Sequence, residues 1–281
     1  MAFISSSVYS HRLRQEISID LYLPNDYTAG RTVTQPQGII YFLHGLGRSQ
    51  QYFKELSATS RYCRDNQLAV VYINAPQSFY VDMAHGMRYF TYITEELPQL
   101  LKSLYGLEFP REKIFLAGLS MGGYGTWKIG LSRPDMFGAI APMSAPCNMK
   151  LVGKLLVQRK AAGKMNEDYM AFFNAFGDDM DIKDEDDIYY LLKQLSRLPA
   201  EQQPRIRMMC GKQDELISIF KQNAALDEYI RTLNLADYKF WKWDGAHEYS
   251  FWDRAILHAI AFFLENDYDE KEIKKWRCER E

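Results

Sequence analysis

Ser120 has surroundings that point to chemistry, because it lies in Gly118-Leu-Ser-Met-Gly122, a match to the pattern G-x-S-x-G. An apolar run, 113–117, precedes this pattern, and an amphipathic segment follows it to about Arg133. Between a strand and a helix the pattern is typical of a nucleophile elbow, in which glycines permit a tight turn and the serine hydroxyl stands clear of the sheet. The alternative is an incidental serine in a glycine-rich connection.

A serine hydroxyl is a weak nucleophile at neutral pH, so it needs a general base and a group that orients the base. His247 follows the last apolar strand of the sequence, and Asp214 follows the strand before it. Both come at the carboxyl ends of strands, the sheet edge at which Ser120 is also expected. We predict that His247 takes the proton of Ser120 and that Asp214 orients His247. Glu215 and Asp244 are the rival carboxylates, and Asp244 lies too near His247 in sequence to approach it from the neighbouring strand.

Acyl transfer also needs hydrogen-bond donors for the oxyanion. Met121 follows the nucleophile and is expected to supply one backbone N–H. The second donor is expected from His44-Gly-Leu-Gly47, most simply the N–H of Leu46. His44 itself is expected at the substrate site, where it orders this loop by hydrogen bonds rather than acting as the base. Tyr80 is the aromatic residue that we expect to line the pocket, because it lies in the loop after a buried strand.

The elements that must position these residues follow from the hydrophobic pattern. An alternating strand with one solvated face is expected at 17–23, and apolar runs typical of buried strands are at 38–43, 68–73, 113–117 and 206–210. Further strands are expected at 138–144 and 238–243. Helices are expected at about 50–65, 90–105, 121–133, 216–232 and 249–264, with a kink or break at Pro98. This alternation predicts an α/β fold with a mostly parallel central sheet and helices on both faces.

Residues 148–204 interrupt this alternation with amphipathic helical pieces and an acidic run, 178–187. We interpret 1–281 as a single domain and 148–204 as a helical cap inserted between two strands. An insertion at the carboxyl edge of the sheet is expected to lie over Ser120 or beside it and to limit the length of the acyl group. The alternatives are a cap that packs on the flank of the sheet and one that builds an interface in a homo-oligomer. The loop 25–37 is Gly, Thr, Pro and Gln rich, and the charged tail from Asn266 is expected to fray.

Composition excludes several classes of protein. Of the 281 residues, 47% are hydrophobic and 25% charged, and the net charge is −2, which gives no electrostatic signature for nucleic acid or an anionic membrane. No window approaches 18 apolar residues and no secretory signal is visible, so a cytoplasmic protein is expected. No cofactor or metal is expected, because there is no Cys/His cluster and the four cysteines are far apart, at Cys63, Cys147, Cys210 and Cys278.

At these residues the sequence resembles the esterase D or tributyrin-esterase group of the α/β-hydrolases, which includes family-one carbohydrate esterases such as feruloyl and acetylxylan esterases. The resemblance covers roughly 10–265 and is weakest in the cap. It rests on four segments, Phe42-Leu-His-Gly-Leu-Gly47, Glu95-Glu-Leu-Pro98, Gly118-Leu-Ser-Met-Gly-Gly-Tyr-Gly125 and Gly245-Ala-His-Glu-Tyr-Ser-Phe-Trp252. It implies an α/β-hydrolase fold and hydrolysis of short-chain or aromatic acyl esters without a cofactor.

The predicted function is therefore that of a serine carboxylesterase that works through an acyl-enzyme. Its substrate would be a small or carbohydrate-linked ester, such as an acetyl or feruloyl ester of a plant carbohydrate. Three alternatives stay open: an S-formylglutathione hydrolase, a peptidase, and a catalytically inactive hydrolase fold that serves as a binding module.

Overall fold

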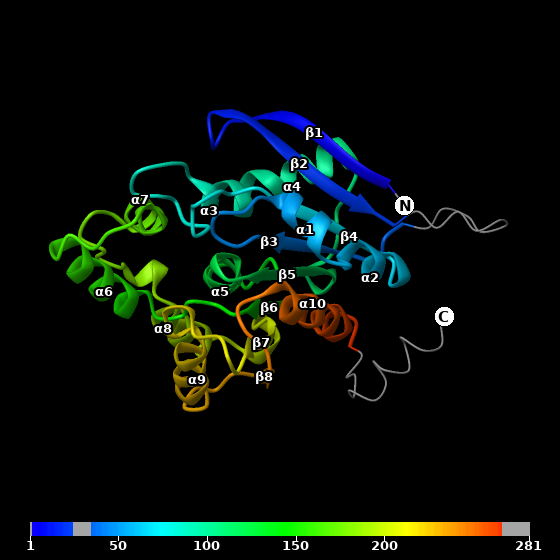
Figure 1. Ribbon diagram of the computed structural model, residues 1–281. Helices are drawn as coiled ribbons and strands as arrows, with labels where there is room; N and C mark the ends of the chain where they lie inside the picture. The colour runs from blue at the N-terminus through cyan, green and yellow to red at the C-terminus, as the bar shows by residue number, and fades with distance from the viewer. Residues whose placement is uncertain (1, 25–34, 266–281) are drawn as a thin grey trace.

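The computed structural model describes residues 2–24 and 35–265. Most of the expected loop 25–37, the charged tail from Asn266 and Cys278 lie outside the described residues. One eight-stranded sheet runs through the molecule in the order β1-β2-β4-β3-β5-β6-β7-β8 (Figure 1). The strands are β1 Ala2–Ser10, β2 Gln15–Leu23, β3 Gly38–Leu43, β4 Leu68–Ile73, β5 Ile114–Leu119, β6 Ala139–Met143, β7 Arg205–Gly211 and β8 Tyr238–Trp243.

Strands β3 to β8 pair in parallel, whereas β1 and β2 form an antiparallel hairpin whose second strand joins β4. The difference follows from the sequence, because every residue of β3 and β4 is apolar or glycine and buried, while β1 alternates partly buried and exposed positions. The predicted α/β-hydrolase fold, with its mostly parallel sheet, is thereby confirmed.

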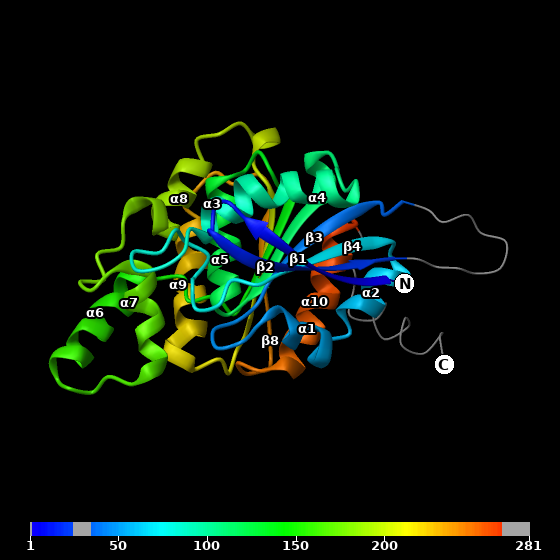
Figure 2. The ribbon, with the colours of Figure 1, turned by 90° about the horizontal axis from the view of Figure 1, so that it is seen from above.

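Helices cover both faces of the sheet (Figure 2). One face is covered by α1 Gln50–Leu56, α2 Thr59–Asp65 and α10 Tyr249–Phe263. The hydrophobic core on this face contains Phe42, Phe53 and Phe115. Helices α4 Leu97–Tyr105, α5 Met121–Ser132 and α9 Ile219–Ile230 contribute to the core on the other face.

The segment predicted as one helix over 90–105 is interrupted. A short helix, α3 Tyr89–Thr91, passes into a π-helical turn, η1 Tyr92–Glu96, before α4 begins. Pro98 has no N–H to give to the carbonyl oxygen of Thr94, and the guanidinium of Arg133 donates to that oxygen over 3.3 Å instead. The expected helix over 50–65 is likewise two helices, α1 and α2, separated by Ser57 and Ala58.

Residues 148–204 connect β6 to β7 and form helices and loops. Figure 2 shows α6 and α7 beyond the end of the sheet at which the parallel strands terminate. The elements are α6 Met149–Ala161, η3 Glu167–Tyr169, α7 Met170–Phe176, η4 Asp184–Asp186, α8 Ile188–Leu195 and η5 Ala200–Gln202.

This insertion is anchored to helix α5 by a buried ion pair. The ammonium of Lys128 lies 2.9 Å from a carboxylate oxygen of Asp186, and the two side chains are 6% and 16% exposed. Lys128 also donates to the backbone oxygen of Glu185, and the hydroxyl of Tyr124 donates to the backbone oxygen of Asp186 over 2.7 Å. Burial raises the pKa of Asp186 against the opposing effect of Lys128. The insertion and the helix that follows Ser120 are therefore joined through polar contacts as well as apolar packing.

No helix within 2–24 and 35–265 is both long and apolar enough to cross a membrane. Cys63, Cys147 and Cys210 are buried free thiols, and burial raises the pKa of each, which keeps them protonated and unreactive.

Candidate active site

Ser120 lies in the tight turn between β5 and α5, and its backbone has φ 56° and ψ −120°, a strained conformation for a non-glycine residue. Glycine is required at positions 118 and 122 for steric reasons. A Cβ atom on Gly118 would lie 2.4 Å from the backbone oxygen of Gly122, and a Cβ on Gly122 would lie 2.1 Å from that of Leu43. Side chains at either position would force the turn open, so the G-x-S-x-G pattern is explained by close backbone approach.

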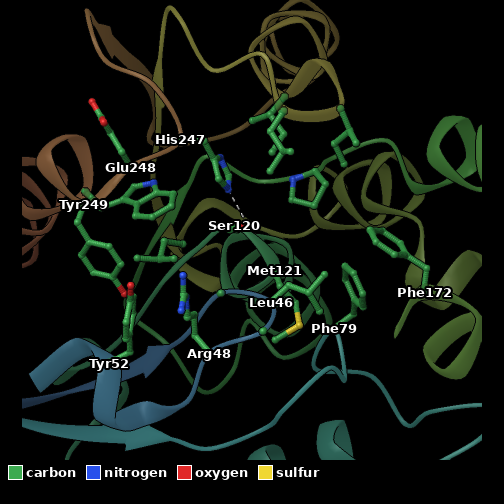
Figure 3. A pocket seen from close by; sticks show the side chains of 18 of the residues that line it. Leu46, Arg48, Tyr52, Phe79, Ser120, Met121, Phe172, His247, Glu248 and Tyr249 are labelled. Atoms are coloured by element: carbon green, nitrogen blue, oxygen red, sulfur yellow. Dashed lines mark hydrogen bonds between the residues drawn. The ribbon is translucent and has the colours of Figure 1, made fainter. Parts of the chain in front are cut away.

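The structure brings together the three residues that the sequence singled out. The Oγ of Ser120 lies 2.9 Å from Nε2 of His247 (Figure 3). Nδ1 of His247 lies 2.8 Å from a carboxylate oxygen of Asp214. The ionised carboxylate can only accept, so Nδ1–H donates to Asp214 and Nε2 is left to accept the serine proton. Each residue lies just past a different parallel strand, β5, β7 or β8.

The rival carboxylates lie elsewhere. Asp244 lies 3.2 Å from the ammonium of Lys212, which lowers the pKa of Asp244, and Glu215 is exposed. Asp214, by contrast, is 1% exposed, and its second carboxylate oxygen has no partner among the described residues. A buried carboxylate bound to His247 is therefore placed to favour the imidazolium that a general base becomes.

Trp252 also contacts the imidazole of His247. Its ring meets that of His247 edge to face, with centroids 4.8 Å apart, and its indole N–H donates to the hydroxyl of Ser144 over 3.1 Å. The position of His247 is thus restricted both by Asp214 and by a ring that is itself hydrogen-bonded. Trp252 is the last residue of the segment Gly245–Trp252 that carries the family resemblance, and the structure adds its contact with His247.

The expected oxyanion donors lie beside the serine. Met121 begins helix α5, so its N–H has no intrahelical acceptor. Leu46 lies in the loop after β3, and Figure 3 shows Leu46 and Met121 next to each other below Ser120. The structure places both residues on the wall of one cavity with Ser120.

His44 and Tyr80 are not where we expected them, because both are fully buried and neither lines the cavity. Burial lowers the pKa of His44 to about 4. The ring is therefore neutral near pH 7, with Nδ1–H donating to the oxygen of Gly45 and Nε2 accepting from the N–H of Ala75. His44 does order the loop, but it does not contact substrate space. The hydroxyl of Tyr80 donates a hydrogen bond to the backbone oxygen of His44. Phe79, and not Tyr80, lines the cavity.

The cavity has a volume of about 540 Å³ and two unlike halves. Figure 3 shows Phe79 and Phe172 on one side of Ser120, and Arg48, Tyr52 and Tyr249 on the other. The apolar half contains Leu46, Phe79, Met121 and Phe172, and the polar half contains Arg48, Tyr52, Glu248 and Tyr249. The cavity is also lined by Pro146, Tyr169, Leu216, Ile217, Ile219 and Trp252.

Three residues of the insertion, Asn166, Tyr169 and Phe172, line the cavity. Phe172 packs on Phe79 with ring centroids 4.4 Å apart. Apolar side chains of this segment, such as Phe172, therefore belong both to the hydrophobic core and to the cavity wall. Within the described part of the chain, no group of three or more His, Cys, Asp or Glu side chains is placed to hold a metal ion.

Residues 10–263 match the model of the Esterase family, described as “Putative esterase”. The chain belongs to this family. It is a serine hydrolase of carboxylic esters with the α/β-hydrolase fold, similar to esterase D.

This esterase is 28% identical over 270 residues to an acetyl esterase of Caldicellulosiruptor saccharolyticus, covering 93% of this chain and 98% of that protein. Two Staphylococcus aureus structures are 30% identical to it, and in each case 94% of this chain and 98% of the other are covered. The fluorophosphonate-binding serine hydrolase FphF superposes with a TM-score of 0.80, and the S-formylglutathione hydrolase FrmB with a TM-score of 0.77.

Proposed function

We propose that this esterase hydrolyses short-chain or aromatic acyl esters through an acyl-enzyme on Ser120. The observation that carries the proposal is the chain of hydrogen bonds from Ser120 through His247 to Asp214, at a cavity with an apolar half. This arrangement fits nucleophilic catalysis with a general base and an orienting carboxylate.

In the proposed acylation step, the Ser120 oxygen attacks the ester carbonyl carbon while its proton passes to Nε2 of His247. The carbonyl oxygen becomes an oxyanion, which accepts hydrogen bonds from the N–H groups of Leu46 and Met121. Asp214 favours the imidazolium. When the tetrahedral intermediate collapses, the bond to the leaving oxygen breaks and His247 returns the proton to it. A water molecule then attacks the carbonyl carbon of the acyl-enzyme and gives its proton to Nε2 of His247. Collapse of this second tetrahedral intermediate breaks the bond to Ser120, whose oxygen takes the proton back, and releases the acid.

The apolar half supports a short or planar acyl group. Phe79 and Phe172 lie in this half with their ring centroids 4.4 Å apart, and Leu216, Ile217 and Ile219 also line the cavity. An acetyl or butyryl chain would fit in such a space, and a feruloyl ring would lie against the phenylalanine rings. Similarity to an acetyl esterase supports the short acyl group. The alcohol would belong to a small molecule or a carbohydrate.

The test is kcat/KM for p-nitrophenyl esters from acetate to octanoate, together with methyl ferulate and acetylated xylan. We expect a maximum between acetate and butyrate or on methyl ferulate. A maximum at octanoate would contradict the proposal.

S-formylglutathione is the second candidate substrate, favoured by the likeness to FrmB over 94% of this chain. The thioester would use the same triad. A kcat/KM on S-formylglutathione that exceeds those on all the oxygen esters by about a hundredfold would make this candidate the function instead.

A further inference from the structure

Arg48 introduces a positive charge into the cavity that the proposed chemistry does not use. It follows the oxyanion loop by one residue, and its guanidinium lies 4.2 Å from the centre of the Tyr52 ring. Among the described residues that line the cavity, Arg48 is the only lysine or arginine. Figure 3 shows its guanidinium inside the cavity, on the side of Tyr52 and Tyr249.

This cation has no anionic partner in the parts of the chain that are described, since none of their ion pairs involves Arg48. Glu248 also lines the cavity, but Figure 3 shows its carboxylate pointing away from both Ser120 and Arg48. The polar half of the cavity therefore presents a guanidinium whose N–H donors are available to a ligand.

Aromatic rings stand beside it. Tyr249 lines the cavity, while its hydroxyl is shielded from solvent. Burial raises the pKa of Tyr249, which keeps its phenol neutral. The ring of Tyr249 stands edge to face against Tyr52 at 5.2 Å and against Trp252 at 5.2 Å, so this side of the cavity is walled by aromatic rings.

We propose that Arg48 binds a carboxylate on the leaving group, so that this esterase prefers esters whose alcohol or thiol is an acid. The inference rests on the proposed function, because it takes Ser120 as the point of attack. With the carbonyl carbon at Ser120, the two substituents of an ester extend in different directions. The acyl group occupies the apolar half, and the leaving group lies in the half that holds Arg48. A planar guanidinium suits a carboxylate because it can donate two parallel hydrogen bonds.

The test compares 4-acetoxybenzoate with 4-acetoxybenzamide, which share the acyl group and shape but differ in one charge. The quantity measured is the ratio of kcat/KM for the benzoate over kcat/KM for the benzamide. We expect Arg48→Gln to lower this ratio about tenfold or more, chiefly through KM, because a charged hydrogen bond is lost. Arg48→Lys should restore part of the ratio. Because intrinsic reactivities of the two esters cancel between variants, only the change in the ratio is used.

Arg61→Gln is the matched control. Arg61 is also an exposed arginine beside a tyrosine ring, 5.4 Å from the centre of Tyr62, but it does not line the cavity. We expect it to leave the ratio unchanged. A thermal melt of each variant verifies folding.

Three outcomes would overturn the inference. If Arg48→Gln leaves the ratio unchanged, Arg48 does not select the carboxylate. If p-nitrophenyl hemisuccinate, whose carboxylate is on the acyl side, depends on Arg48 while 4-acetoxybenzoate does not, the anion site belongs to the acyl group. If the wild type turns over neither acetate ester nor methyl ferulate, the proposed function fails along with the inference, whereas turnover of both acetate esters without dependence on Arg48 leaves the proposed function standing.

Discussion

The hydroxyl of Tyr80 donates a hydrogen bond to the backbone oxygen of His44 over 2.9 Å, with both residues fully buried. The contact joins the loop after β4 to the loop that carries Leu46. Helix α5 packs closely against Tyr80, since a Cβ atom on Gly125 would lie 2.4 Å from the Tyr80 ring. Tyr80 therefore braces the proposed oxyanion loop without touching the cavity.

Tyr80→Phe should lower both stability and kcat. The variant leaves the buried oxygen of His44 without its donor, which costs about 1–3 kcal/mol in the free energy of unfolding. We expect kcat to fall with little change in KM, because a loosened loop weakens binding of the oxyanion more than of the substrate. Chemical denaturation and steady-state kinetics measure the two effects. Tyr105→Phe, which removes a hydroxyl that donates to Ser6 at 2.6 Å, is the control and should keep kcat; an unchanged kcat in Tyr80→Phe would refute the bracing role.

Ser120→Ala should abolish turnover and leave the fold intact. Triad members act as a unit, so loss of the nucleophile is expected to cost on the order of 10⁶ in kcat. Labelling by a fluorophosphonate should disappear as well, while circular dichroism and the melting temperature stay close to those of the wild type. A variant that kept a tenth of the activity would remove Ser120 from the mechanism.

The neutral, buried His44 should make stability depend on pH. Its pKa is lowered from 6.5 to about 4 in the folded protein, so the unfolded chain binds the proton more readily. The stability that this difference provides is complete above about pH 6.5 and is lost as the pH falls toward 4, by up to about 3 kcal/mol. In denaturation curves from pH 7.5 to 4.5, the advantage of the wild type over His44→Gln should shrink. The same series on His11→Gln, at an exposed position, is the control, and a constant gap for His44→Gln would contradict the assignment.

Phe172→Ala should shift the acyl preference toward longer chains. The ring closes the apolar half against Phe79, and removing it opens space for several methylene groups. Each methylene that gains a place is worth about 1 kcal/mol, so the ratio of kcat/KM for octanoate over acetate should rise about tenfold or more. Met170→Ala is the control, because Met170 is on the same helix but is 49% exposed and does not line the cavity. An unchanged acyl profile in Phe172→Ala would show that the insertion does not set chain length.

The parts of the fold that sequence could predict are those governed by burial. The runs Gly38–Leu43 and Leu68–Ile73 are fully buried and become strands with the expected bounds. Tyr238–Trp243 also has the expected bounds, although it is an edge strand and only partly buried. The G-x-S-x-G pattern identified Ser120, and its two partners followed because strand ends in a parallel sheet meet at one edge.

The positions of the other cavity residues depend on backbone conformation in the loops. Phe79 and Tyr80 both have positive φ, 50° and 59°, in a region that non-glycine residues seldom adopt. This turn directs Phe79 to the cavity and Tyr80 into the core, a choice that hydrophobicity cannot predict for two adjacent aromatic residues. Arg48 and Tyr52 belong to no motif, and only the path of the chain after β3 brings them beside Ser120.

The ion pair between Lys128 and Asp186 has a consequence for motion near Ser120. If residues 184–186 swung away from helix α5, this largely buried pair would be broken and both charges would have to be solvated. Tyr124, one turn along the helix that begins beside the nucleophile, would lose its acceptor in the same motion. These contacts therefore couple the turn Asp184–Asp186 to the helix that begins beside the nucleophile, so that a displacement of this turn would be transmitted toward Ser120.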